Sequence, residues 1–254
     1  MRTLAVTNQK GGSGKTTSTV NVAAALGERG RRVLVVDLDP QASASSWFGV
    51  KDGGKGLLEV LSGNGNLVDI VCETDVVGVD VVPSSTWLVG AERALASEPG
   101  AETILRRAVE RLPRDRWDFL FVDCPPALGL LVLSALTACH EVFVPVEAST
   151  MALSGLASLL QTVERVKERL NPDLRLSAIL ACRVDYRTNL SRDVVDRLRE
   201  RFGPLVLKTV IRENVRLREA WSFSKPITSY QTNSTGAEDY RAAAAELSKK
   251  GDRT

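Results

Sequence analysis

The stretch TNQKGGSGKTT, residues 7–17, decides the fold of this 254-residue chain. It follows the apolar run TLAVT (3–7) and leads into a helical pattern over 15–29. A strand, a glycine-rich turn and a helix in this order are typical of a phosphate-binding loop. The usual pattern is G-x-x-x-x-G-K-[ST], whose first glycine would fall at position 9. Gln9 stands there instead, and an extra lysine, Lys10, comes ahead of the expected Lys15.

Short apolar runs alternate with helical patterns along the chain. Continuously apolar strands are typical of a parallel sheet covered by helices on both faces. The alternation predicts a doubly wound α/β fold with a mostly parallel sheet. We find no internal repeat or long linker and expect a single domain over residues 1–254. The expected strands are 3–7, 32–39, 79–84, 117–124, 141–147, 176–184 and 205–211, and the expected helices are 15–29, 86–97, 101–112, 149–170 and 190–202.

The loop carries the residues that ATP binding needs. Its three glycines let the backbone turn amide groups toward phosphate oxygens. Lys15 is expected to reach the β- and γ-phosphates and Thr16 to ligate Mg²⁺. The alternative is a glycine-rich turn that binds nothing. The nucleotide-binding stretch is expected to comprise Lys10, Gly11, Gly12, Ser13, Gly14, Lys15, Thr16 and Thr17.

Carboxylates follow two of the expected strands. FLFVDCPP (119–126) is an apolar strand ending in Asp123, which could hold the Mg²⁺ shell beside the loop. VLVVDLDPQAS (33–43) places Asp37 and Asp39 at the carboxyl end of another strand, where α/β sheets bind ligands. We expect Asp39 to orient an attacking water and to contribute to the metal site, with a helix cap as its alternative role. The expected cofactors are therefore ATP and Mg²⁺.

These motifs together resemble a known family. K-G-G-x-G-K-T-T, D-x-D-P-Q and an apolar run ending in D-C-P-P are similar to the deviant Walker-A ATPases, and among them to the ParA/Soj partition ATPases. The likeness extends to 185–203, 214–230 and 234–247. It implies a slow ATPase that dimerises on ATP, and it makes Lys10 the signature lysine, which reaches the nucleotide of the other subunit. A ParB-like partner is implied as the stimulator of hydrolysis.

The resemblance also implies where the adenine lies. In relatives a segment like IPRN lines the adenine pocket, and here it is IREN (211–214). We assign Arg212 and Asn214 to nucleotide binding on this basis. Ser224 is a second departure, because relatives usually have glycine before the K-P pair.

Positive charge gathers in one segment. From position 183 to 218 there are ten basic and five acidic residues, a net charge of +5, whereas the whole chain carries +2. A basic patch of this kind is typical of phosphate-backbone binding, although a solvated helix face is the alternative. The resemblance implies sequence-independent DNA binding by Arg187 and Arg216, and we add Arg218.

Composition narrows the alternatives. The start of the chain leaves no room for a signal peptide, and no apolar run reaches the length of a membrane span. We therefore expect a cytoplasmic, nucleoid-associated protein without a membrane partner. A MinD-like membrane ATPase is disfavoured by the alanine-rich end YRAAAAELSKKGDRT. An iron–sulfur relative like the nitrogenase reductase would need cluster cysteines from each subunit; Cys124 and Cys139 are available, but Cys124 belongs to the D-C-P-P run typical of ParA-like strands. A metabolic enzyme such as a dethiobiotin synthetase remains a further alternative. The cargo, whether chromosome, plasmid or protein assembly, is not specified by the sequence.

Overall fold

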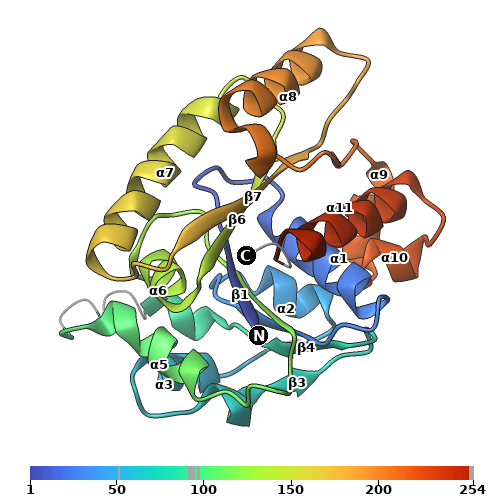
Figure 1. Cartoon of the computed structure of the whole chain (residues 1–254). Coiled ribbons are helices and arrows are strands. Elements are labelled where there is room, and N and C mark those ends of the chain that lie inside the picture. The colour runs from blue at the N-terminus through green and yellow to red at the C-terminus, as the bar shows by residue number, and fades with distance from the viewer. Residues whose placement is uncertain (51, 91–94, 96–97, 252–254) are drawn as a thin grey trace.

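The computed structural model describes residues 1–254 except 51, 91–94, 96–97 and 252–254 (Figure 1). Within the described residues, seven strands form one sheet in the order β3-β4-β2-β5-β1-β6-β7. Every neighbouring pair is parallel except the antiparallel edge pair β3–β4. The strands are β1 (Arg2–Val6), β2 (Val33–Asp37), β3 (Cys72–Glu73), β4 (Val79–Val82), β5 (Phe119–Asp123), β6 (Glu141–Glu147) and β7 (Arg175–Cys182).

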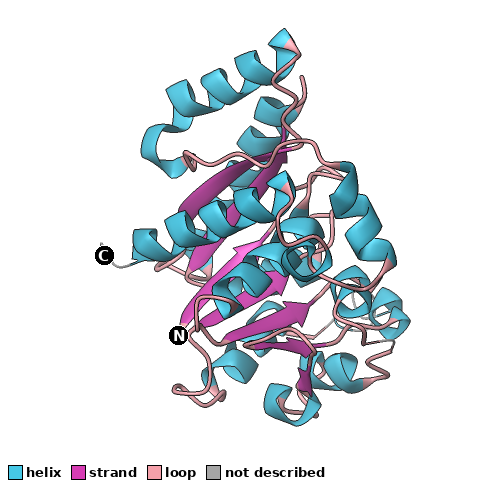
Figure 2. Ribbon diagram, turned by 90° about the vertical axis from the view of Figure 1, so that its right-hand side faces the viewer, coloured by secondary structure: helices cyan, strands magenta, loops and turns pink. Residues whose placement is uncertain are grey.

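Helices cover both faces of the sheet, as Figure 2 shows. Alternate residues of the central strands point to two separate apolar cores: Leu120 and Val122 of β5 enter one, Phe119 and Phe121 the other. The α-helices are α1 (Lys15–Gly27), α2 (Ser43–Trp47), α3 (Gly56–Leu61), α5 (Ile104–Glu110), α6 (Leu130–Ala138), α7 (Ala152–Arg169), α8 (Asn189–Phe202), α9 (Val215–Ser222), α10 (Ile227–Tyr230) and α11 (Thr235–Gly251). Short 3₁₀ turns span Leu67–Ile70, Thr86–Gly90, Ala101–Thr103 and Gly203–Leu205. The doubly wound, mostly parallel fold expected from the sequence is confirmed.

The expected strand 205–211 is wrong. Within it only Val206 forms an isolated bridge, to Ile179, and a second bridge joins Arg212, just beyond it, to Val184. The Glu246 carboxylate of α11 accepts hydrogen bonds from the backbone amides of Lys208 (2.8 Å) and Thr209 (3.1 Å). Because these amides are bound to a side chain, they cannot continue the ladder with β7.

Two helix predictions also need adjustment. The expected helix 86–97 starts as the 3₁₀ turn Thr86–Gly90, and much of the remainder lies outside the described residues. The expected helix 101–112 divides into the 3₁₀ turn Ala101–Thr103 and α5. The strand β3 was not foreseen, since two residues carry no periodic pattern.

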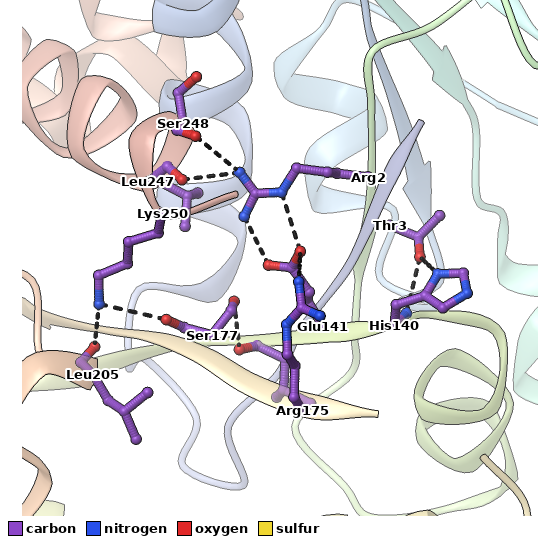
Figure 3. Close-up of polar contacts among 11 residues, drawn as sticks. Arg2, Thr3, His140, Glu141, Arg175, Ser177, Leu205, Leu247, Ser248 and Lys250 are labelled. Carbon is purple, nitrogen blue, oxygen red and sulfur yellow. Dashed lines mark hydrogen bonds and ion pairs between the residues drawn. The ribbon is translucent and has the colours of Figure 1, made fainter. Parts of the chain in front are cut away.

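Arg2 joins the two ends of the chain (Figure 3). Its guanidinium binds both oxygens of Glu141 at the start of β6, at 3.1 and 2.7 Å. It also donates to the carbonyl oxygens of Leu247 (3.0 Å) and Ser248 (3.3 Å) near the end of α11. The pKa of Glu141 is lowered because hydrogen bonds and charge from Arg2 outweigh its burial. The last helix is thereby fixed to the first strand.

The apolar face of α11 is buried in the protein. Tyr240, Ala243, Ala244 and Leu247 are at most 1% exposed and belong to the core shared with α1. No helix in the described part of the chain is both long enough and apolar enough to cross a membrane.

Candidate functional site

A cavity of about 720 Å³ opens between the loop after β1 and the helix α9. A ligand of nucleotide size fits a cavity of this volume. The lining comes from segments far apart in the sequence, all near the carboxyl ends of the parallel strands. These residues are Gly11, Gly12, Ser13, Gly14, Lys15, Thr16, Thr17, Asp39, Ser43, Trp47, Pro126, Cys182, Arg183, Ile211, Arg212, Glu213, Asn214, Leu217, Arg218, Trp221, Ser222 and Tyr240.

The loop 7–17 has the geometry of an anion site. Gly12 and Gly14 have φ of 73° and 92°, a left-handed conformation that favours glycine. Gly14 is also the residue before α1, and no side chain caps the first amides of that helix. Asn8 fixes the base of the loop, donating to the carbonyl oxygen of Pro145 at 2.8 Å and accepting from the Lys10 amide at 3.1 Å. Uncapped amides at a helix N-terminus fit the phosphates of a nucleotide.

Thr16 and Asp123 meet as the sequence predicted. The Thr16 hydroxyl donates to Asp123 at 2.7 Å, and Thr19, one turn further along α1, donates to the other carboxylate oxygen at 2.9 Å. Among the described residues no cluster of three or more histidine, cysteine, aspartate or glutamate side chains could hold a metal alone. Mg²⁺ suits such a site, because it is commonly held by one or two protein oxygens together with phosphates and water.

Burial dominates the electrostatics behind the loop. Asp37 and Asp123 are both completely buried, and burial raises their pKa values to about 6 and about 7. The charge of Asp37 raises the pKa of Asp123 further, while Thr16 and Thr19 lower it. Burial also lowers the pKa of Lys15, opposed by the charge of Asp123. A divalent cation bound beside Asp123 would lower the cost of ionising that buried carboxylate.

Asp39 lies at the cavity without being buried in it. It lines the wall, and its Oδ1 accepts a hydrogen bond from the Gln41 amide at 3.0 Å. Asp37 has a different role: both the amide and the hydroxyl of Ser45 donate to it, at 2.8 and 2.7 Å, fixing the start of α2. The turn contact of Asp39 leaves its second oxygen available to a ligand or water.

Lys10 is not among the residues that line the cavity, although the next residue, Gly11, is. Its ammonium group binds the Glu147 carboxylate at the end of β6 and the Ser149 hydroxyl, the latter at 3.0 Å. Arg183, just after β7, binds the other oxygen of Glu147 at 2.9 Å and has a left-handed backbone with φ of 54°. Lys15, in contrast, lines the cavity and is 7% exposed. The two lysines of the motif therefore occupy different places, with Lys10 at the rim.

Known proteins resemble this chain over nearly its whole length. A family model described as an AAA domain matches residues 1–176. The sporulation initiation inhibitor protein Soj of Bacillus subtilis is 43% identical over 250 residues, covering 98% of each chain. The chromosome partitioning protein ParA of Myxococcus xanthus is 40% identical over 251 residues, 98% of this chain and 88% of that one. The chain belongs to the ParA/Soj family of partition ATPases.

Solved structures agree with this ParA/Soj assignment. A cobyrinic acid a,c-diamide synthase from Mycobacterium smegmatis, solved with an ATP analogue and magnesium, has 37% identity and a TM-score of 0.86, covering 99% of this chain and 96% of that one. The septum site-determining protein MinD from Pyrococcus horikoshii, complexed with Mg-ADP, has 26% identity and a TM-score of 0.79, covering 98% and 97%. The sequence prediction of a P-loop ATPase fold is confirmed.

The adenine-pocket residues assigned in this ParA/Soj ATPase have other partners. Arg212 lines the cavity, but its guanidinium binds Asp239 of α11 at 2.7 Å and approaches Glu238 at 3.6 Å. Asn214 caps α9, accepting from the Arg216 amide at 2.8 Å, and donates to Thr235 at 2.9 Å. Both side chains thus stabilise the cavity wall, and their contact with a base stays a prediction.

The three arginines expected to bind DNA do not share one environment in the ParA/Soj chain. Arg187 is 89% exposed in its side chain and binds Asp185 at 2.9 and 2.8 Å, which lowers the pKa of that aspartate to about 2. Arg216, in the first turn of α9, binds Glu219 at 2.7 Å. Arg218 instead lines the nucleotide cavity. Two of the three therefore face solvent with an acidic neighbour.

Several residues in and around the cavity were missed from the sequence. Thr19 could have been found from its helical spacing to Thr16, and Glu147 and Arg183 from their positions at strand ends. Trp221 belongs to no recognisable sequence motif. The cysteines considered for an iron–sulfur cluster, Cys124 and Cys139, are fully buried with raised thiol pKa values, so they offer no thiolate at the surface of this ParA/Soj chain.

Proposed function

We propose that this ATPase moves DNA cargo: it dimerises on ATP, binds DNA without sequence preference, and hydrolyses ATP when a ParB-like partner stimulates it. The observation that carries the proposal is the separation of the two lysines. Lys15 lines the cavity of its own chain, whereas Lys10 is at the rim, where it binds Glu147 and Ser149. A cation that its own phosphate loop does not use is available to the loop of a second copy.

The cavity residues supply the roles that phosphoryl transfer needs. The loop amides and Lys15 would bind phosphate oxygens, and Thr16 with Asp123 would hold Mg²⁺, whose charge would neutralise that of the phosphates. Asp39, whose second oxygen has no protein donor among the described residues, accepts from the attacking water and orients it. Lys10 from the partner subunit adds a second cation at the γ-phosphate, as an arginine finger does. Hydrolysis is complete only in the dimer.

DNA attachment follows from the basic segment. Arg187 lies in the loop after β7 and Arg216 at the start of α9, so both lie near the carboxyl edge of the sheet. Their guanidinium groups are exposed, and each arginine neutralises a DNA phosphate. Dimerisation doubles these contacts, which makes retention on DNA dependent on ATP. In the cell this places the protein on the nucleoid, in the cytoplasm.

A metabolic role is the second candidate, because one structural neighbour at 37% identity is named a cobyrinic acid a,c-diamide synthase. The sequence relatives at 43% and 40% identity are instead Soj and ParA. An experiment separates the candidates: the purified protein is applied to unrelated DNA duplexes with Mg²⁺ and ADP, ATP or a non-hydrolysable analogue. Retention with ATP or the analogue but not with ADP supports the partition function. A protein that never binds DNA yet amidates cobyrinic acid would overturn it.

Dimerisation is tested directly by sedimentation. The wild type is expected to dimerise with the analogue, and Lys10→Ala to remain a monomer while keeping most of its nucleotide affinity. Lys15→Ala is the matched variant, because it removes the other lysine and is expected to lose nucleotide binding itself. A Lys10→Ala protein that dimerises like the wild type would remove the cross-subunit role of this lysine.

A further inference from the structure

One face of α9 forms the wall of the cavity opposite the phosphate loop. The wall residues recur every three or four positions, the spacing that places side chains on one side of a helix. They are Asn214, Leu217, Arg218, Trp221 and Ser222. Val215 and Arg216, which the helical spacing places on another side, are absent from the lining.

Trp221 stands out on this wall. It is an apolar ring in the lining and is nevertheless 51% exposed. The other tryptophan of the cavity, Trp47, is 3% exposed and donates from its indole nitrogen to the carbonyl oxygen of Lys225 at 2.7 Å. Trp47 is thus part of the core, whereas the indole nitrogen of Trp221 has no hydrogen-bond acceptor in the described part of the chain. A large ring left exposed inside a ligand cavity marks a surface that the ligand covers.

The charge of Arg218, next to Trp221 on the wall, also indicates a ligand surface. Arg218, one turn before Trp221, has no carboxylate partner among the described residues. Other arginines of this region are paired, Arg212 with Asp239 and Arg216 with Glu219. The wall therefore combines an exposed indole with an unpaired guanidinium, a combination that suits a flat, electron-rich ring.

The position of this wall is fixed relative to the phosphate loop. Asn21 of α1 donates to the carbonyl oxygen of Thr17 at 2.7 Å and accepts from the amide of Ile227 at 2.7 Å. The bond from Trp47 to Lys225 anchors the same segment to α2. Since the segment that follows α9 is fixed to both helices, Trp221 keeps a set distance from the phosphate site.

We propose that Trp221 stacks on the base of the bound nucleotide and makes the cavity selective for purines. The inference rests on the ATPase function proposed above. Phosphates bound at the loop place the ribose and base toward α9, where the indole is the exposed aromatic surface among the described wall residues. Stacking strength grows with ring area, so a purine binds better than a pyrimidine. The indole does not by itself separate adenine from guanine, because both present the same fused rings.

The test is calorimetric titration with Mg-ADP. Trp221→Ala is expected to bind Mg-ADP about tenfold more weakly than wild type, the usual order for removing one base-stacking aromatic. Trp221→Phe, which keeps a ring, is expected to stay within about threefold. Phe223→Ala is the matched control, because Phe223 is 63% exposed and lies two residues further on, outside the cavity lining.

Two further ligands separate the contribution of the base to binding from that of the phosphates. Mg-tripolyphosphate has no base, and its affinity is expected to be unchanged in Trp221→Ala, whereas a loss would indicate damage to the phosphate loop and overturn the inference. Mg-UDP is expected to bind wild type more weakly than Mg-ADP. The ratio of these two affinities is expected to be smaller in Trp221→Ala. An unchanged ratio, or wild-type Mg-ADP affinity in Trp221→Ala, would overturn the stacking role while leaving the ATPase function intact. Wild type that binds no nucleotide would instead overturn the proposed function.

The fluorescence of Trp221 gives an independent readout. Mg-ADP is expected to change the tryptophan emission of wild type, and Trp221→Phe to remove most of that change although Trp47, Trp87 and Trp117 remain. An equal change in both proteins would assign it to the other tryptophans and count against stacking. A variant with normal Mg-ADP affinity but impaired dimerisation or DNA binding would place Trp221 in a partner interface and overturn the inference.

Discussion

Replacing Arg187 and Arg216 by alanine should detach the ATP-bound dimer from DNA. Both guanidinium groups are exposed, with side-chain exposures of 89% and 56%. Each is paired with an acidic neighbour, Asp185 or Glu219. Such exposed ion pairs contribute only about 0–1 kcal/mol, so exchanging the carboxylate for a phosphate costs little. The counterions released from DNA then decide the outcome.

The size of the effect follows from the number of contacts. Two arginines in each protomer neutralise about four phosphates in the dimer, which gives a slope of about −3.6 in log K against log salt. Raising salt from about 50 to about 200 mM should then weaken wild-type binding by about 150-fold. The double variant should lose most of this slope, and a monomer with half the contacts should bind much more weakly than the dimer.

Filter binding on two unrelated duplexes, at both salt concentrations and with a non-hydrolysable ATP analogue, measures the slope. Arg111→Ala/Arg114→Ala is a suitable control, because it removes the same charge at the end of α5, far from α8 and α9 (Figure 1). Sedimentation must show that the Arg187→Ala/Arg216→Ala protein still dimerises. Wild-type affinity and slope in that protein would refute the reasoning and leave the basic segment as a solvated face.

Three further predictions concern the cavity. Asp39→Ala should bind ATP and dimerise but release phosphate at least about a hundredfold more slowly, since no group then orients the water; phosphate release and sedimentation measure the two properties. Glu147→Gln should strengthen analogue-induced dimerisation, because it weakens the ion pair that holds Lys10 within its own chain; sedimentation at several protein concentrations measures it. Without nucleotide, the melting temperature should fall as the pH rises from about 5 to about 8. The reason is that Asp123 has a pKa of about 7 in the folded chain, well above its ordinary value. In this pH range the folded chain holds more protons than the unfolded chain, so raising the pH favours unfolding. Asp123→Asn should reduce this fall and also abolish Mg²⁺-dependent turnover, as scanning calorimetry and phosphate release would show.

Each of these has an outcome that contradicts it. Normal turnover in Asp39→Ala would leave that residue with only its contact to the Gln41 amide. Unchanged or weaker dimerisation of Glu147→Gln would mean that the pair with Lys10 does not compete with the partner subunit. The same melting profile in Asp123→Asn and wild type would show that Asp123 titrates at an ordinary pH.

The phosphate half of the site could be predicted because its chemistry is local. The glycines, Lys15 and Thr16 lie within one loop, and Asp123 falls at the end of an adjacent strand, where parallel topology must bring it. The opposite wall could not be predicted from residue spacing, since it combines α9 with residues from α2, β7 and α11. Only the family resemblance pointed to Arg212 and Asn214, and both line the cavity. Trp221 gives no signal in one sequence, because an isolated tryptophan is more often part of a core.

The wrong strand at 205–211 has a related cause. LVLKTVI is apolar and β-branched, and local propensity favours a strand. The segment does not form a strand because the carboxylate of Glu246, far along the sequence, accepts hydrogen bonds from the amides of Lys208 and Thr209. Arg212 shows the same limit, since its neighbour in space, Asp239, lies on another helix. Tertiary contacts of this kind have no counterpart in the local pattern.

The bond network of Arg2 has a consequence for the order of synthesis. β1 leaves the ribosome first, yet it lies between β5 and β6, and its residue Arg2 pairs with Phe119. Arg2 also binds carbonyl groups of α11, which is made last and carries Tyr240 of the cavity wall. A nascent chain therefore cannot complete its nucleotide cavity until α11 has been made. If the chain pairs on ATP as proposed, a chain that lacks α11 is expected to be left out of the dimer.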